Sequence, residues 1–77
     1  MSRIFIDDDL LRWEVYASGG KHGTPEEAKI VFHCTNGPAQ RARVIRHDGD
    51  HAAAQRVVAT YSEDELREML GRAEVLR

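Results

Sequence analysis

The sequence has little of what several classes of small protein require. Cys34 is its only cysteine, so no internal disulfide can form, whereas small secreted domains usually carry several cysteines. The apolar run 4–6 ends at three aspartates, well short of the roughly 7 apolar residues that a signal peptide needs. No segment approaches the roughly 18 apolar residues of a membrane span. We therefore expect a cytoplasmic protein with no membrane contact.

An excess of charge of one sign is also missing. Eleven Lys and Arg residues stand against thirteen Asp and Glu residues, a net charge of −2, whereas a dedicated nucleic-acid-binding domain usually has a clear basic excess. The 42% hydrophobic and 31% charged content is typical of a globular domain, and 77 residues allow one domain, 1–77, with a small core. This length leaves no room for two lobes with a cleft between them. We identify no catalytic residue and expect no cofactor.

Four segments have the patterns of β-strands. Trp13, Val15 and Ala17 alternate with polar residues, which is typical of a strand with one buried face. Ile30 and Val31 are adjacent apolar residues, which indicates a central strand covered on both faces. A short turn then favours an antiparallel hairpin with the next strand. The predicted strands are 3–7, 12–17, 29–35 and 41–47.

The C-terminal part is predicted to be helical. Asp50 can cap a helix over 51–60, although Asp48 and Gly49 could instead form a hairpin turn into a further strand. Ser62 and Glu65 have the spacing of a capping box, in which each side chain accepts a hydrogen bond from the other's backbone N–H. A second helix is predicted over 63–76, with an apolar face made of Leu66, Met69, Leu70, Ala73 and Leu76.

Together these elements predict an α+β fold. A four-stranded, mainly antiparallel sheet, open or curled, is followed by one or two helices packed on one face, because helices and sheets bury their apolar sides against each other. The predicted core consists of Trp13, Val15, Phe32, Val44, Leu66, Met69 and Leu70.

One layer of helices cannot cover both faces of this sheet. Alternation assigns a second, largely apolar face to Phe5, Tyr16, Val31, His33, Arg43 and Ile45. If the sheet does not curl into a barrel, this face is available to a partner, since contiguous exposed apolar patches usually mark interaction sites. We therefore predict a non-enzymatic protein-interaction module or homodimeric regulatory domain, whose partner-binding residues are Phe5, Tyr16, Val31, Arg43 and Ile45.

A nucleic-acid-binding domain is the first alternative. Residues 29 to 46 contain four basic side chains and no acidic one, and basic strand residues beside an aromatic ring can hold RNA through phosphate contacts and stacking. The residues concerned are Lys29, Arg41, Arg43 and Arg46.

A metal- or thiol-dependent enzyme is the second alternative. Two imidazoles and two carboxylates lie within 47–51, and a further histidine or cysteine could complete a zinc site. The ligands concerned are His33, Cys34, His47 and His51. The default expectation is no metal, because turn and cap roles explain the acidic residues. A thiol mechanism is also not expected, because His33 and Cys34 point to opposite faces of one strand and His33 cannot activate the thiol.

Two segments resemble a family of small uncharacterised bacterial proteins. Residues 5–15 are similar to the family's N-terminal Phe-x-Asp-x-x-Gly-x-x-Trp-Glu-Val hairpin, with Asp7 and Trp13 at matching positions and Leu10 where the family has a turn glycine. Residues 62–70 are similar to its C-terminal Ser-Asp-x-Glu-Leu-x-x-Leu-Leu helix. The resemblance implies a sheet followed by a helix and carries no function.

Overall fold

The computed structural model describes residues 2–20, 27–37 and 40–76. Four strands come first in the chain: β1 (Ser2–Ile6), β2 (Arg12–Ser18), β3 (Lys29–Cys34) and β4 (Arg43–Arg46). The helices α1 (His51–Thr60) and α2 (Glu63–Arg72) follow, and the short strand β5 (Glu74–Val75) completes the order. The predicted α+β class and the sequence of sheet and then helices are confirmed.

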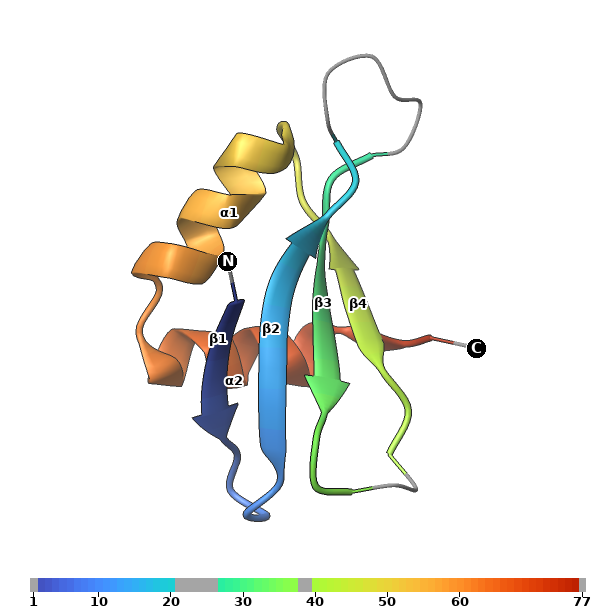
Figure 1. The fold of residues 1–77 in the computed structure, drawn as a ribbon, viewed down its shortest axis with the longest axis vertical. Coiled ribbons are helices and arrows are strands. Elements are labelled where there is room, and N and C mark those ends of the chain that lie inside the picture. Colours follow the sequence, from blue (N-terminus) through green and yellow to red (C-terminus); the bar gives the residue numbers. More distant parts are fainter. Residues whose placement is uncertain (1, 21–26, 38–39, 77) are drawn as a thin grey trace.

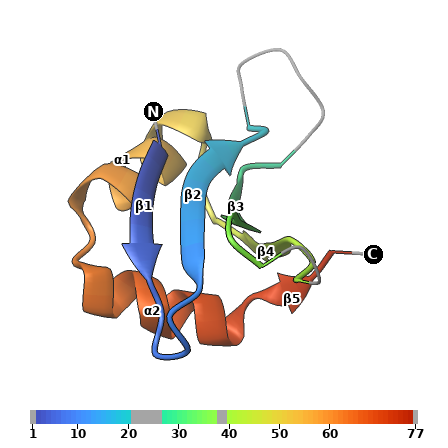
Figure 2. The ribbon, with the colours of Figure 1, turned by 60° about the horizontal axis from the view of Figure 1, so that its bottom comes forward.

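The strands form one antiparallel sheet in which neighbours in sequence are neighbours in space, in the order β1-β2-β3-β4-β5. The sheet is open, with β1 and β5 at its two edges. Both helices pack on one side of it, and α2 crosses behind the strands in Figure 1. Figure 2 shows the connection between α1 and α2 extending past β1.

Local signals in the sequence explain where the helices begin. The Asp50 side chain accepts a hydrogen bond from Ala53 N at 2.9 Å, so a helix and not a further strand follows Gly49. The Ser62 side chain accepts from Glu65 N, and the Glu65 carboxylate accepts from Ser62 N, which confirms the predicted capping box.

The end of the second helix differs from the prediction. The helix expected over 63–76 ends at Arg72, and Ala73 is already extended, with φ −72° and ψ 146°. The following residues pair with β4, and Leu76 N donates to Ala42 O at 2.7 Å. The prediction was wrong because the apolar spacing extends to Leu76 while the chain there pairs with a strand. This pairing gives the backbone groups at the edge of β4 hydrogen-bond partners, which a helix continued to 76 would not supply.

The core lies between the sheet and the helices. Six of the seven predicted core residues are buried there, and Phe5, Ile30, Ala54 and Val58 join them. Val44 is the exception: it is half-buried on the opposite face, directly across from Val31.

Three residues predicted for the second face point toward the helices instead. Phe5 lies opposite Trp13, is 2% exposed and packs edge-on against the Phe32 ring at 6.1 Å between centroids. Arg43 lies opposite Phe32, and Ile45 lies opposite Ile30. The face assignments of Phe5, Arg43 and Ile45 were therefore wrong. A shift of one residue in strand register moves every side chain to the other face of the sheet. Because neighbouring residues in 4–6 and 44–45 are all apolar, hydropathy alone does not say which of them faces the helices.

Candidate interaction surface

The side of the sheet opposite the helices is called the open face here. Alternate residues of the strands point to it, as the cross-strand registers require. No helix in the described ranges packs on it. Its residues are Ser2, Ile4, Ile6, Arg12, Glu14, Tyr16, Ser18, Lys29, Val31, His33, Val44, Arg46 and Glu74.

An apolar row crosses the middle of the open face. Tyr16, Val31 and Val44 are direct cross-strand partners on β2, β3 and β4. Val31 is only 9% exposed although no helix covers it, because the side chains on both neighbouring strands shelter it. Tyr16 is 36% exposed. Of the five predicted partner-binding residues, only Tyr16 and Val31 lie on this face.

The most exposed apolar side chains of the face lie on the edge strand. Ile4 is 59% exposed and Ile6 is 44% exposed, and both belong to β1. On the open face they adjoin Glu14 and Arg12, their direct cross-strand partners. An edge strand that presents large apolar side chains to solvent is unusual, because such edges pair readily with another chain.

Charges of both signs border the apolar row. Lys29 and Arg46 are direct cross-strand partners, and the Arg46 guanidinium donates to the Glu27 carboxylate, a hydrogen bond that raises the arginine pKa. Glu14 lies on the far side of the row and accepts a hydrogen bond from Ser2 Oγ at 2.7 Å. The face therefore has a basic end at Lys29 and Arg46 and charges of both signs, Glu14 and Arg12, on the other side of the row.

The four residues predicted to hold RNA do not come together. Lys29 and Arg46 share the open face, and Arg41 is exposed just before β4. Arg43 lies on the helix side, where its guanidinium stands 5.3 Å from the centre of the Trp13 ring and Nη1 donates to Leu70 O at 3.4 Å. The Arg43 charge therefore interacts with the face of the Trp13 ring at the edge of the core.

The four candidate metal ligands are also dispersed. His33 points to the open face and Cys34 to the helices, where the thiol is 7% exposed. His51 Nδ1 lies 2.9 Å from Gly19 O, beyond the opposite end of β3. In the described part of the chain no three His, Cys, Asp or Glu side chains are grouped to hold a metal ion. The zinc and thiol sites drawn from His33, Cys34, His47 and His51 thus have no geometric support.

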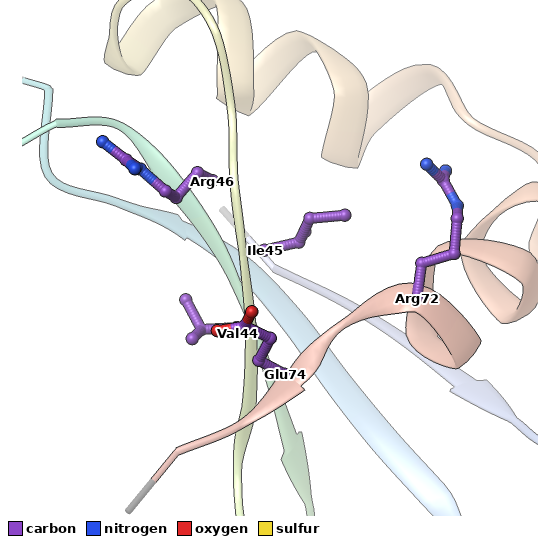
Figure 3. Close-up of a pocket in the computed structure, with 5 residues that line it drawn as sticks. All are labelled: Val44, Ile45, Arg46, Arg72 and Glu74. Carbon is purple, nitrogen blue, oxygen red and sulfur yellow. The ribbon is translucent and has the colours of Figure 1, made fainter.

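A notch of about 230 Å³ lies beside β4 where β5 begins. β5 pairs with Arg43 and Val44, so the chain coming from α2 joins the edge of β4 at Val44 and leaves the edge beside Ile45 uncovered. Figure 3 shows the Arg46 and Arg72 guanidinium groups on opposite sides of Ile45, pointing apart. The two cations do not converge on one point, so the notch offers no paired anion site.

Sequence reasoning missed Ile4, Ile6 and Val44 as open-face residues. One signal could have found the first two: the hairpin between β1 and β2 places Phe5 across from Trp13, so the flanking isoleucines must face the other way. For Val44 no local signal exists, because Val44 and Ile45 are equally apolar.

Neither helix in the described residues is long and apolar enough to cross a membrane. Comparisons of the chain with protein-family models, with curated proteins and with solved structures found no match.

Proposed function

We propose that this protein is a non-enzymatic interaction module that acts as a homodimer, and that the uncovered side of its sheet makes the contacts. The observation that carries the proposal is the one-sided placement of the helices. It leaves Ile4 and Ile6 exposed beside the Tyr16, Val31 and Val44 row. Burying such side chains contributes about 25 cal/mol for each Å² of apolar surface removed from water.

A second copy of this chain is the occupant that the charges favour. The open face carries Lys29 and Arg46 at one end, and Glu14 and Arg12 on the other side of the apolar row. A surface with separated charges of both signs can complement itself, and a two-fold interface requires that property. A strongly acidic or strongly basic partner would leave one of these groups facing a like charge.

A cytoplasmic location and a kinship with the small bacterial proteins that residues 5–15 and 62–70 resemble are parts of the same proposal. The single cysteine supports the location, since Cys34 has no partner for a disulfide.

The mass in solution, measured by light scattering from about 1 µM to about 1 mM, tests the proposal. We expect the mass to rise to that of two chains within this range. The double variant Ile4→Lys/Ile6→Lys should remain at the mass of one chain, because it places charges in the contact. The matched control Ala52→Lys/Ala59→Lys adds the same charges at exposed positions of α1 and should dimerise like the unmodified protein. A wild-type mass of one chain at every concentration contradicts the proposal.

Nucleic-acid binding is the competing function, and variants of Lys29 and Arg43 distinguish it from dimerisation. Lys29 lies on the open face, whereas Arg43 lies over Trp13 on the helix side. If RNA bound the open face, Lys29→Gln would weaken binding and flatten its salt dependence, and Arg43→Gln would not. We expect no salt-dependent RNA binding by the unmodified protein at physiological ionic strength.

A further inference from the structure

The free edge of β1 has its backbone groups pointing away from the sheet at alternate residues. Asp7 N donates to Leu11 O at 2.9 Å, and the register of β1 with β2 continues from this pair. Arg3 and Phe5 therefore direct their N–H and C=O groups toward β2. Ser2, Ile4 and Ile6 direct theirs outward. The Arg67 guanidinium confirms this direction, because Nε donates to Ile6 O at 2.8 Å.

The two edge regions of the sheet differ in whether their outward backbone groups are paired. At the β4 edge, β5 pairs with Arg43 and Val44 and covers part of the strand. At the β1 edge, no backbone group in the described residues pairs with the outward N–H and C=O of Ile4. Natural edge strands resist pairing by means of a charged side chain, a proline, a bulge or a covering loop. Of these, β1 carries a charged side chain, Arg3, on its helix side. On the open face β1 instead presents Ser2, Ile4 and Ile6, none of which is charged.

We propose that two copies of this chain join through β1, antiparallel and centred on Ile4, so that their sheets form one continuous sheet. This inference rests on the proposed self-association and narrows its contact to β1 and the adjoining edge of the open face, so that the Tyr16, Val31 and Val44 row stays exposed on the joined sheet. With Ile4 opposite the partner's Ile4, the two Ile4 residues exchange N–H and C=O bonds, and Ser2 lies opposite Ile6. The Ile6 carbonyl, which already accepts from Arg67 Nε, then uses its second lone pair for the Ser2 N–H of the other copy. A two-fold axis perpendicular to the sheet relates the copies, so the interface is isologous and closes as a dimer.

The side chains agree with this register. Ile4 of each copy packs beside its counterpart on the open face, with Ile6 next to them, which buries the two most exposed apolar side chains of the open face. On the helix side Arg3 lies opposite Phe5 of the other copy, so no like charges face each other across the seam. Both helical layers lie on the same side, and the two open faces merge into one surface.

A backbone variant tests the inference. Ile4→Pro removes an outward donor and leaves the pairs with β2 intact, since proline is tolerated on an edge strand whose N–H faces solvent. The matched control Ile4→Ala trims the same side chain and keeps the donor. We expect sedimentation velocity to show a dissociation constant at least tenfold weaker for Ile4→Pro than for Ile4→Ala. If Ile4→Pro does not fold, Ser2→Pro removes another outward donor at the first residue of the strand and should weaken dimerisation in the same way.

A third variant separates failure of this inference from failure of the proposed function. Val44→Lys changes the middle of the open face, away from β1, and Glu74 lies directly opposite it to accept the charge. We expect Val44→Lys to dimerise like the unmodified protein. Dimerisation lost in Val44→Lys and kept in Ile4→Pro would overturn pairing through β1 in favour of sheets stacked face to face, and self-association would stand. A wild-type protein that stays monomeric would overturn both.

Discussion

The Trp13 indole Nε1 donates a hydrogen bond to Asp7 Oδ2 at 2.8 Å, although the tryptophan side chain is 0% exposed. The other carboxylate oxygen, Oδ1, accepts from Asp9 N at 2.8 Å and from Leu11 N at 2.9 Å. One carboxylate thus holds the loop between β1 and β2 and satisfies the only polar atom of the largest core side chain. Asp7 sets the hairpin register that turns Ile4 and Ile6 to the open face.

Replacing Asp7 with alanine should destabilise the protein by about 1–3 kcal/mol, because the Trp13 N–H is left without a partner and the loop loses two backbone hydrogen bonds. Urea unfolding followed by the fluorescence of the single tryptophan measures this change. The control Asp8→Ala removes a neighbouring exposed carboxylate and should alter the free energy of unfolding by less than about 0.5 kcal/mol. Equal effects of the two variants would contradict the role given to Asp7.

Protonation of the Asp7 carboxylate should lower the free energy of unfolding in acid. Partial desolvation acts to raise the Asp7 pKa, but the hydrogen bonds from Trp13 Nε1 and from the Leu11 and Asp9 amides outweigh it and lower the pKa below its ordinary 3.8. Because the Asp7 pKa is lowered in the folded state, the carboxylate contributes fully to the free energy of unfolding above about pH 4. This contribution is lost as the pH falls through the pKa of the folded state. The stability difference between the unmodified protein and Asp7→Asn should therefore be largest at neutral pH and shrink below pH 3.8. A difference independent of pH would contradict this.

Leu10 occupies a backbone conformation that suits glycine. Its φ is +64°, and its side chain is 77% exposed, so it gains little from burial. The left-handed conformation costs an L-residue about 1–2 kcal/mol, which glycine avoids. Part of this stabilisation is offset because glycine also raises the conformational entropy of the unfolded chain. Leu10→Gly should stabilise the protein by roughly 0.5–1 kcal/mol in urea unfolding. Leu10→Ala keeps the unfavourable φ and should give no gain; equal gains from both variants would point to loss of the exposed leucine as the cause.

The Ser62 cap should account for a measurable part of the stability. Ser62→Ala removes the acceptor for Glu65 N and should cost about 1 kcal/mol, whereas Ser62→Gly should cost only a few tenths. Thermal unfolding followed by circular dichroism compares the two. An alanine variant as stable as the glycine variant would show that the capping box contributes little.

Local signals made the helices and the β2 strand predictable. The Ser62 and Glu65 spacing defined the start of α2, and the alternation of Trp13, Val15 and Ala17 placed β2 correctly. These signals lie within a few residues of the structure they specify. The end of α2 depended instead on a distant strand: Leu76 finds its hydrogen bond at Ala42.

The candidate surface was less predictable because both faces of two strands are apolar. Ile4, Phe5 and Ile6 are interchangeable by hydropathy, and the choice between them follows from the Asp7 loop and the pairing of Phe5 with Trp13. Val44 and Ile45 present the same ambiguity, which only the register with β3 resolves. The existence of an uncovered face followed from counting helices, whereas its composition required the registers.

The exchange rate of the Ile4 backbone amide with solvent, measured by NMR at low and high protein concentration, tests the central claim most directly. Phe5 N–H, paired with β2, should be protected at both concentrations, whereas Ile4 N–H should exchange freely in the dilute sample and become protected in the concentrated one. An Ile4 amide that exchanges freely while light scattering reports two chains would contradict pairing through β1.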